Sequence, residues 1–228
     1  MLKRVSFALV LLVGLLPASR VKNELLNRLG HQIHPKAKID PVLFLKVLRI
    51  EVGEGTHVWS GNLFKNLRGL RIGTHGTLMR WNRVTAVPAF RRTQNADPEK
   101  VGVLWLGDHV VVTKGHALDC SGGVVMEDWS AIAGRETLVY SHSYDPSIHE
   151  LTCAVTRIGE NAFIAARTPM ASGALLPKRS VLAMGSTLMP GKTKENCLYA
   201  GMPARAVRDI SDWKMQSGRD MQRPPMEA

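Results

Sequence analysis

The sequence predicts an all-β protein in which short parallel strands stack as a β-helix, with a helical segment at the N-terminus and a short helix and tail at the C-terminus. Three observations predict this class: a six-residue repeat of large apolar residues, small residues at a fixed phase of that repeat, and few aromatic residues. Aromatic residues make up 6% and apolar residues 45% of the 228 residues, so aliphatic side chains must fill the core. Such a core suits a narrow coil better than a broad sandwich.

The repeat is most regular in the second half of the chain. Apolar residues fall at every sixth position there: Ile158, Ile164, Met170, Leu176, Leu182 and Leu188. Small residues follow four positions later: Ala162, Thr168, Ala174, Ser180 and Ser186. A helical period of 3.6 does not fit a repeat of six. The pattern indicates flat sides whose large residue points inward, joined by tight corners where only a small residue fits.

The same repeat is interrupted further upstream. Leu106, Val112 and Leu118 keep it, the Asp119–Val125 stretch inserts two extra residues, and Met126, Ile132 and Leu138 resume it. Residues 33 to about 84 are predicted to form imperfect early coils. Residues 85–103 are predicted to form a polar loop that leaves the coil, which is typical either of a functional lid or of a tolerated surface insertion.

The chain is expected to divide into an N-terminal helical segment (1–32), a β-helix domain (33–205, with the loop insertion at about 85–103) and a C-terminal helix and tail (206–228). The apolar run from Val5 to Leu16 is too short to span a bilayer. Three interpretations stay open for it: a signal peptide cleaved near Pro17-Ala18-Ser19, a membrane contact through residues 1–30, or an end cap of the coil. Ser19 is the predicted N-cap of a second helix, whose basic face would carry Arg20, Lys22 and Arg28.

The formal net charge of +11 predicts affinity for anions, such as a phosphate-bearing cofactor or an acidic lipid. The sequence contains no aromatic and basic RNA-binding motif, so no nucleic acid partner is predicted. Its three cysteines are Cys120, Cys153 and Cys197, an odd number without a CxxC pair. This argues against a disulfide framework and a structural zinc site, and indicates free thiols in a reducing compartment.

Three segments carry a resemblance to a known family. They are the repeat RIGENAFIAARTPMASGALLPKRSVLAMGSTLMPG, the segment LYAGMPARAVRDI from Leu198 to Ile210, and the segment YSHSYDP from Tyr140 to Pro146. Together they resemble the hexapeptide-repeat acyltransferases, in particular the sugar and exopolysaccharide O-acetyltransferases. The resemblance implies a left-handed β-helix of three parallel sheets, a homotrimer with active sites between subunits, and acyl transfer from acetyl-CoA.

The resemblance also implies which residues act. His142 lies in the segment that resembles the catalytic loop, and is the predicted general base for the acceptor hydroxyl, since an imidazole titrates near neutral pH. A carboxylate would orient it, with Asp145 as the first candidate and Glu136 as the second. The predicted coenzyme A contacts are Ala165, Ala183, Gly185 and Ser186 along the pantetheine, and Lys192 and Arg205 at the phosphates.

Alternatives remain at this point. The same fold occurs in γ-class carbonic anhydrases, but the spacing of His142 and His149, and of His109 and His116, does not match their metal ligands, so no metal is predicted. A non-catalytic scaffold is the second alternative. The predicted acceptor is a sugar hydroxyl, on a small molecule or a lipid-linked glycan precursor, and the predicted location is the cytoplasm or the inner face of the membrane.

Overall fold

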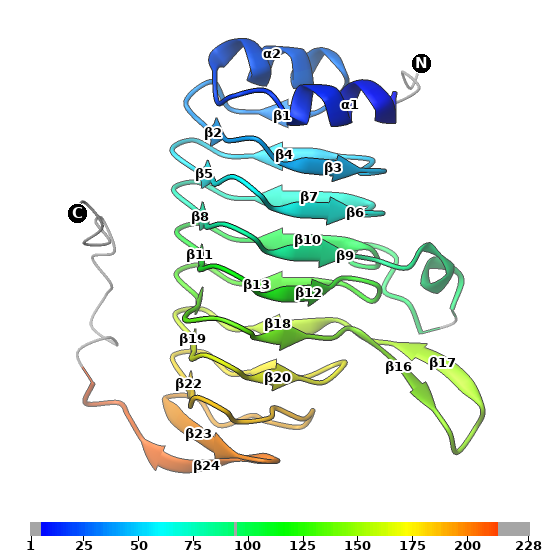
Figure 1. Cartoon of the computed structure of the whole chain (residues 1–228). Coiled ribbons are helices and arrows are strands. Elements are labelled where there is room, and N and C mark those ends of the chain that lie inside the picture. Colours follow the sequence, from blue (N-terminus) through cyan, green and yellow to red (C-terminus); the bar gives the residue numbers. More distant parts are fainter. Residues whose placement is uncertain (1–5, 94, 214–228) are drawn as a thin grey trace.

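The computed structural model describes residues 6–93 and 95–213, which form a three-sided coil whose turns stack along one axis (Figure 1). Each turn contributes one short strand to each of three parallel sheets. The fold is a left-handed parallel β-helix, as the family resemblance implies, and is therefore an exception to the usual right-handed crossover between parallel strands. Two helices cover its N-terminal end, and a β-hairpin ends it at the other.

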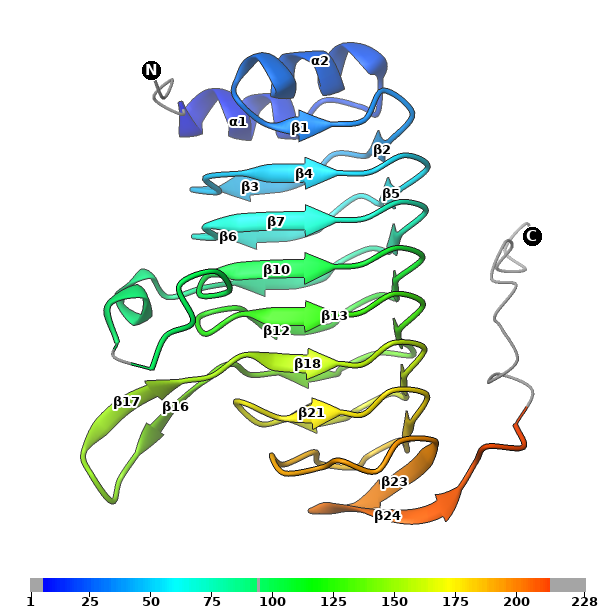
Figure 2. The ribbon, with the colours of Figure 1, turned by 180° about the vertical axis from the view of Figure 1, so that it is seen from behind.

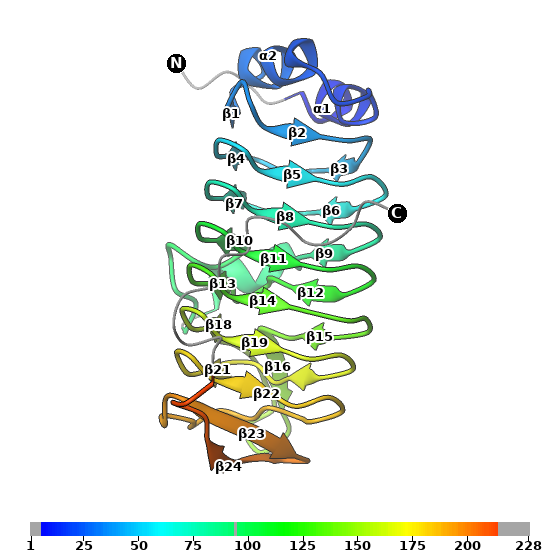
Figure 3. The ribbon, with the colours of Figure 1, turned by 90° about the vertical axis from the view of Figure 1, so that its left-hand side faces the viewer.

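The three sides are called sheets A, B and C here. Sheet A contains β1 (Gln32–Ile33), β4 (Ile50–Val52), β7 (Gly69–Ile72), β10 (Val103–Leu106), β13 (Val124–Met126), β18 (Thr156–Ile158) and β21 (Leu175–Leu176). Sheet B, which faces the viewer in Figure 3, contains β2 (Lys38–Ile39), β5 (His57–Val58), β8 (Thr77–Leu78), β11 (Val111–Val112), β14 (Ala131–Ile132), β19 (Phe163–Ile164), β22 (Val181–Leu182), β23 (Cys197–Gly201) and β24 (Ala204–Asp209). Sheet C contains β3 (Leu43–Leu45), β6 (Leu63–Lys65), β9 (Arg83–Thr85), β12 (Ala117–Asp119), β15 (Leu138–Val139) and β20 (Pro169–Met170).

Strand register explains why the early repeat is irregular. Ile50 pairs with Leu70, so the early coils contain 20 residues, whereas Arg157 pairs with Leu175 in the last coils, which contain 18. Only an 18-residue coil gives three equal sides of six. The extra residues lie at the corners, where they shift the phase of the repeat without disturbing the inward positions.

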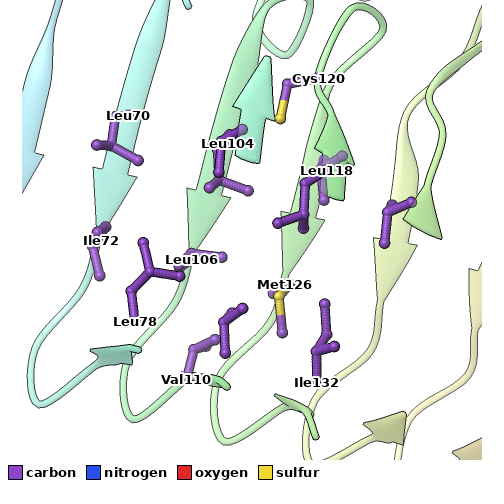
Figure 4. Packing of buried hydrophobic residues seen from close by; sticks show 14 of the residues in the cluster. Leu70, Ile72, Leu78, Leu104, Leu106, Val110, Leu118, Cys120, Met126 and Ile132 are labelled. Carbon is purple, nitrogen blue, oxygen red and sulfur yellow. The ribbon is translucent and has the colours of Figure 1, made fainter. Parts of the chain in front are cut away.

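The inward positions form one continuous column of mostly aliphatic side chains, part of which is shown in Figure 4. Every large residue of the repeat from Ile158 to Leu188 is fully buried, and so are the small corner residues that follow, apart from Ser186, which is 2% exposed. One assignment is wrong. Val139, and not Leu138, points inward at β15, because the corner before it contains two left-handed residues, Gly134 and Glu136.

Glycines after β4, β7 and β10 allow neighbouring corners to approach closely. A Cβ atom on Gly53 would lie 2.6 Å from the carbonyl oxygen of Gly73 and 2.8 Å from the amide nitrogen of Thr74. Both neighbours are backbone atoms, which cannot rotate away. By contrast, a Cβ on Gly69 in β7 would meet only the Val103 side chain, at 3.5 Å.

We therefore expect Gly53→Ala to lower the free energy of unfolding by about 1–3 kcal/mol, through overpacking. Gly69→Ala is the matched control and should change stability by less than about 1 kcal/mol. Thermal melting at equal protein concentration measures both, with an expected fall of several degrees for Gly53→Ala only. Equal melting temperatures for the two variants would contradict the close approach of these corners.

The N-terminal helices are α1 (Phe7–Gly14) and α2 (Arg20–Arg28), and both pack on the first coil. The Ser19 hydroxyl accepts the Lys22 backbone N–H at 3.1 Å, so Ser19 is the N-cap of α2 as predicted. The assignment of Lys22 to an exposed basic face is wrong. Its buried ammonium donates to the carbonyls of Gly14, Leu16 and Asp40 at 2.8–2.9 Å, and thereby ties α1 to the coil.

The coil ends in the antiparallel hairpin β23–β24, so regular structure continues to Asp209, beyond the expected boundary at residue 205. The predicted C-terminal tail is described only as far as Trp213, and residues 214–228 lie outside the described part of the chain. Within residues 6–93 and 95–213, no helix combines the length and apolarity needed to cross a membrane. The three cysteines are free and buried.

Candidate active site

Two segments leave the coil on the same side, at the corner between sheets C and A (Figures 1 and 2). The first follows β9 and contains the 3₁₀ helix η1 (Pro88–Arg92), within the loop predicted at 85–103. The second follows β15 and is the antiparallel hairpin of β16 (His142–Asp145) and β17 (Glu150–Cys153). His142 lies at the base of this hairpin, where the chain leaves the coil.

The His142 ring contacts a carboxylate of the preceding coil. Its Nδ1 lies 2.7 Å from Oδ1 of Asp119, the last residue of β12. A carboxylate can only accept, so Nδ1–H donates and Nε2 is left to accept a proton. The His142 side chain is 29% exposed and that of Asp119 is 14% exposed, so solvent and ligands reach the imidazole more readily than the carboxylate. This is the geometry of a general base with its orienting group.

The Asp119 carboxylate is held by several donors. The backbone N–H of Ser121 donates to Oδ1 at 3.1 Å, and its hydroxyl donates to Oδ2 at 3.0 Å. The Ser141 hydroxyl lies 3.2 Å from Oδ1 and also donates to the Asp119 backbone carbonyl at 2.6 Å. These contacts fix the carboxylate before any substrate binds, so the imidazole is held in one orientation.

The loop after β9 packs onto the same site. The Phe90 ring of η1 lies against the His142 ring, with centroids 4.6 Å apart. The Val87 N–H donates to the Ser121 hydroxyl at 2.9 Å, and the Thr93 hydroxyl lies 3.1 Å from the Cys153 sulfur, on the strand that pairs with His142. The loop is therefore part of the site and supports one side of the imidazole.

A shallow pocket of about 300 Å³ adjoins Asp119 on the outer face of sheet C. Arg83, Thr85 and Tyr140 line it together with Leu138. It combines a guanidinium, hydroxyl groups and apolar surface with the Asp119 carboxylate that contacts His142. Such a lining can bind a polar molecule through hydrogen bonds while excluding part of its water.

Within one chain, neither predicted orienting carboxylate contacts His142. Asp145 lies in the hairpin turn, where its Oδ1 accepts the Ser147 hydroxyl at 2.6 Å and the Ser147 N–H at 2.9 Å, and these bonds lower the pKa of Asp145. Asp145 is therefore a turn residue. Glu136 lies at the other edge of sheet C, between sheets B and C, and pairs with Arg167 at 2.9 Å. Sequence reasoning missed Asp119.

The predicted coenzyme A contacts are not near His142 within one chain. Ala165, Ala183, Gly185 and Ser186 lie at the corner between sheets B and C, at the opposite edge of sheet C. The backbone N–H groups of Ala165 and Ala183 already donate hydrogen bonds within the coil, to the carbonyls of Leu182 and Tyr199 respectively. Lys192 lies between β22 and β23 near the C-terminal end of the coil, and Arg205 lies exposed on β24. Within one chain, these small residues therefore lie at the edge of sheet C away from His142, beside exposed side chains such as Met184.

Two further histidines have structural contacts. His149 Nδ1 lies 2.7 Å from the Tyr144 hydroxyl in the hairpin. His116 is buried, accepts the Thr137 N–H at Nδ1 (3.2 Å) and lies 2.9 Å from the Thr113 hydroxyl at Nε2. These bonds need a neutral ring, and burial lowers the pKa of His116 to about 4. Among the described residues, no group of three or more His, Cys, Asp or Glu side chains could hold a metal ion.

A pH-dependent loss of stability follows for His116. Between pH 6.5, the ordinary pKa of histidine, and about pH 4, His116 binds a proton in the unfolded chain but not in the folded chain. Stability therefore falls as the pH drops through this range. As the pH falls from neutral to about 5, His116 should lower the free energy of unfolding by about 2 kcal/mol. Urea titrations of the wild type and His116→Gln measure it: the wild type should lose more stability than the variant over this range. Equal losses of stability in the wild type and His116→Gln would contradict this role of His116.

Comparisons with known proteins agree with this architecture. No family model matches the sequence, and no curated protein matches it. A mutant of AntD, an N-acyltransferase from Bacillus cereus in complex with dTDP and coenzyme A, is 14% identical over 76% of this chain and 90% of its own, with a TM-score of 0.58. A hexapeptide transferase family protein from Anaplasma phagocytophilum is 16% identical over 82% of this chain and 83% of its own (TM-score 0.40). A maltose O-acetyltransferase from Clostridium difficile is 13% identical over 89% of this chain and 83% of its own (TM-score 0.37).

The class defined by these observations is the left-handed parallel β-helix of the hexapeptide-repeat type. At such low sequence identity, the likeness to AntD establishes the fold. What the chain does has to be inferred from its own site.

Proposed function

We propose that this protein is an acyltransferase that moves an acetyl or other acyl group from acyl-CoA to a hydroxyl of a sugar or glycan precursor, with His142 as the general base. The observation that carries the proposal is the hydrogen bond between His142 Nδ1 and Asp119 beside an open pocket. The similarity in fold to AntD, which was crystallised with coenzyme A and dTDP, supports a thioester donor and a sugar-nucleotide or sugar acceptor. The His142–Asp119 pair also fits this chemistry, since acyl transfer from a thioester needs a base and no metal.

In the proposed reaction, His142 Nε2 takes the proton of the acceptor hydroxyl as its oxygen attacks the thioester carbonyl. The resulting tetrahedral intermediate collapses, the carbon–sulfur bond breaks, and the coenzyme A thiolate takes the proton from the imidazolium. Asp119 stabilises the imidazolium between these two steps, because its carboxylate lies 2.7 Å from Nδ1. The products are an ester and free coenzyme A, and His142 returns to its starting form.

The proposed active unit is a homotrimer. Within one chain, the His142 edge and the edge of Ala165, Ala183 and Gly185 lie at opposite borders of sheet C. A cyclic arrangement of three chains brings one edge of each chain to the other edge of its neighbour. The pantetheine would then lie along the small residues of the neighbouring chain, with Lys192 or Arg205 available to the phosphates. The buried free thiols agree with a location in the cytoplasm.

The test is release of free thiol from acetyl-CoA against a panel of sugars, amino sugars and nucleotide sugars. We expect acceptor-dependent thiol release by the wild type, and an acylated product one acetyl group heavier by mass spectrometry. Lability of this product to mild alkali would identify an ester, whereas stability would identify an amide and correct the acceptor to an amine. Binding of acetyl-CoA without transfer to any acceptor would favour the non-catalytic scaffold instead.

A further inference from the structure

The outer surface of α1 is apolar where a helix at a protein surface is normally polar. The helix reads FALVLLVG and contains no charged or hydrogen-bonding side chain. Val10 and Gly14 face the coil and are buried, but Leu9 is 49% and Leu12 is 61% exposed. The exposed apolar surface continues beyond the helix through Leu15, Leu16 and Val21. A helix that is apolar all round normally lies within a core or within lipid.

Basic residues border this apolar surface. A pocket of about 370 Å³ opens between α1 and strands β3 and β6, and is lined by Phe7, Leu11 and Phe44 together with two lysines, Lys46 and Lys65. Among the described residues that line it, none is acidic. Both lysines are exposed. Neither lies within a run of basic residues, so they are not part of a generally charged, solvated surface. An apolar surface bordered by ammonium groups is complementary to the acyl chains and phosphates of an anionic membrane.

The pocket and the candidate active site lie on one row of sheet C. Leu45 pairs with Lys65, Lys65 with Thr85, and Thr85 with Asp119, all in register. Since neighbouring strands are about 4.8 Å apart, Lys65 lies about 10 Å from Asp119 along the outer face. A phosphate bound by Lys65 would therefore lie within the length of one or two sugar rings from the base.

We propose that α1, with Lys46 and Lys65, docks the N-terminal end of the coil onto an anionic membrane surface, and that this presents a lipid-linked acceptor to His142. The second part rests on the proposed function, whereas the docking itself does not. The helix cannot swing freely, because the Lys22 ammonium holds the Gly14 and Leu16 carbonyls against the coil. Docking of α1 therefore fixes the orientation of the whole coil. In a cyclic trimer with parallel coils, the α1 helices of all three chains would face the same membrane.

The first experiment measures docking without any acyl donor. The full chain is floated with vesicles of phosphatidylcholine alone, or of phosphatidylcholine with about one-third phosphatidylglycerol. We expect binding to the anionic vesicles that weakens with added salt. Leu9→Glu combined with Leu12→Glu should lower the partition coefficient at least tenfold, and Lys46→Glu combined with Lys65→Glu by about tenfold.

Matched controls carry the same substitutions elsewhere. Leu151→Glu alters an exposed leucine of the hairpin, and Lys114→Glu an exposed lysine at the corner between sheets B and C; both should bind vesicles as the wild type does. The four altered side chains of α1, β6 and the corner after β3 are exposed, so folding should be retained, and circular dichroism checks this. Absence of wild-type binding, or equal binding by the α1 variant, would overturn the proposal. A change of oligomeric state in that variant, without wild-type vesicle binding, would assign α1 to contacts between copies.

The second experiment tests the acceptor. The sugar that the thiol-release panel identifies is offered free in solution and as its dodecyl glycoside in anionic vesicles. We expect the α1 variant to lose at least tenfold in rate with the dodecyl glycoside, and to keep the wild-type rate with the free sugar. Equal rates with both acceptors would reject the presentation of a lipid-linked acceptor, even if docking holds. If thiol release fails with every acceptor, the proposed function fails and the flotation result still stands.

Discussion

His142→Gln is expected to lower kcat for acyl transfer by about 10²–10⁴-fold, the usual contribution of a general base. Glutamine retains a polar side chain of similar length, but its amide cannot take a proton from the acceptor hydroxyl near neutral pH. The acceptor would then have to attack the thioester as a neutral hydroxyl. Binding of acetyl-CoA should change little, since the proposed contacts of the coenzyme lie on the neighbouring chain. Initial rates of thiol release at saturating acceptor, with a separate measurement of acetyl-CoA affinity, distinguish these effects.

His149→Gln is the matched control, because it makes the same change in the same hairpin. The His149 ring contacts the Tyr144 hydroxyl on the exposed part of the hairpin, and within the described residues it makes no hydrogen bond with Asp119. Its rate should stay within about threefold of the wild type. Equal losses in the two variants would mean that the hairpin matters as a structural unit, and would remove the case for His142 as the base.

The fold could be predicted because the core of a β-helix repeats a local rule. Each side needs one large inward residue and each corner one small residue, so Ile158, Ile164 and Met170 mark three successive sides without knowledge of the rest of the chain. The earlier coils were harder to predict, since their 20-residue turns place the extra residues at corners. Left-handed corners without glycine occur in the early coils, for example at His75 and Trp81, and also in the regular later coils, for example at Asn161, so glycine alone does not mark the corners.

The site could be predicted only in part, and the reason is a one-residue error of register. Taking Leu138 as the inward residue of β15 aligns Asp119 with Val139, which points into the core. The structure pairs Leu118 with Val139 instead, so that Asp119 lies beside Tyr140 and its carboxylate reaches His142. Side chains alternate between the two faces of a strand, so a slip of one residue moves every neighbour to the wrong face. Correct counting of the corner at Gly134 and Glu136 would have revealed Asp119.

The second large effect is expected for Asp119→Asn, which should lower kcat by about 10²–10³-fold. Asparagine keeps the size of the side chain, but its amide group can donate to His142 Nδ1 and so leave the proton on Nε2, where a base must accept one. The imidazolium that forms during transfer would also lose its negative partner. Because the contact is made through His142, the loss should not add to that of His142→Gln, and the double variant should be about as slow as His142→Gln alone.

Asp145→Asn and Glu136→Gln complete this test, because they make the equivalent change in the two carboxylates that the loop pattern favours. In the described part of the chain, Asp145 accepts from Ser147 and the backbone near it, and Glu136 pairs with Arg167 at the far edge of sheet C. Both variants should keep kcat within about threefold of the wild type, since an exposed ion pair or turn contact contributes little. A loss in Glu136→Gln as large as in Asp119→Asn would indicate that a neighbouring chain brings Glu136 to the base. A comparable loss in Asp145→Asn would mean that the hairpin rearranges when substrate binds, and that Asp119 is not the group that orients His142 during transfer.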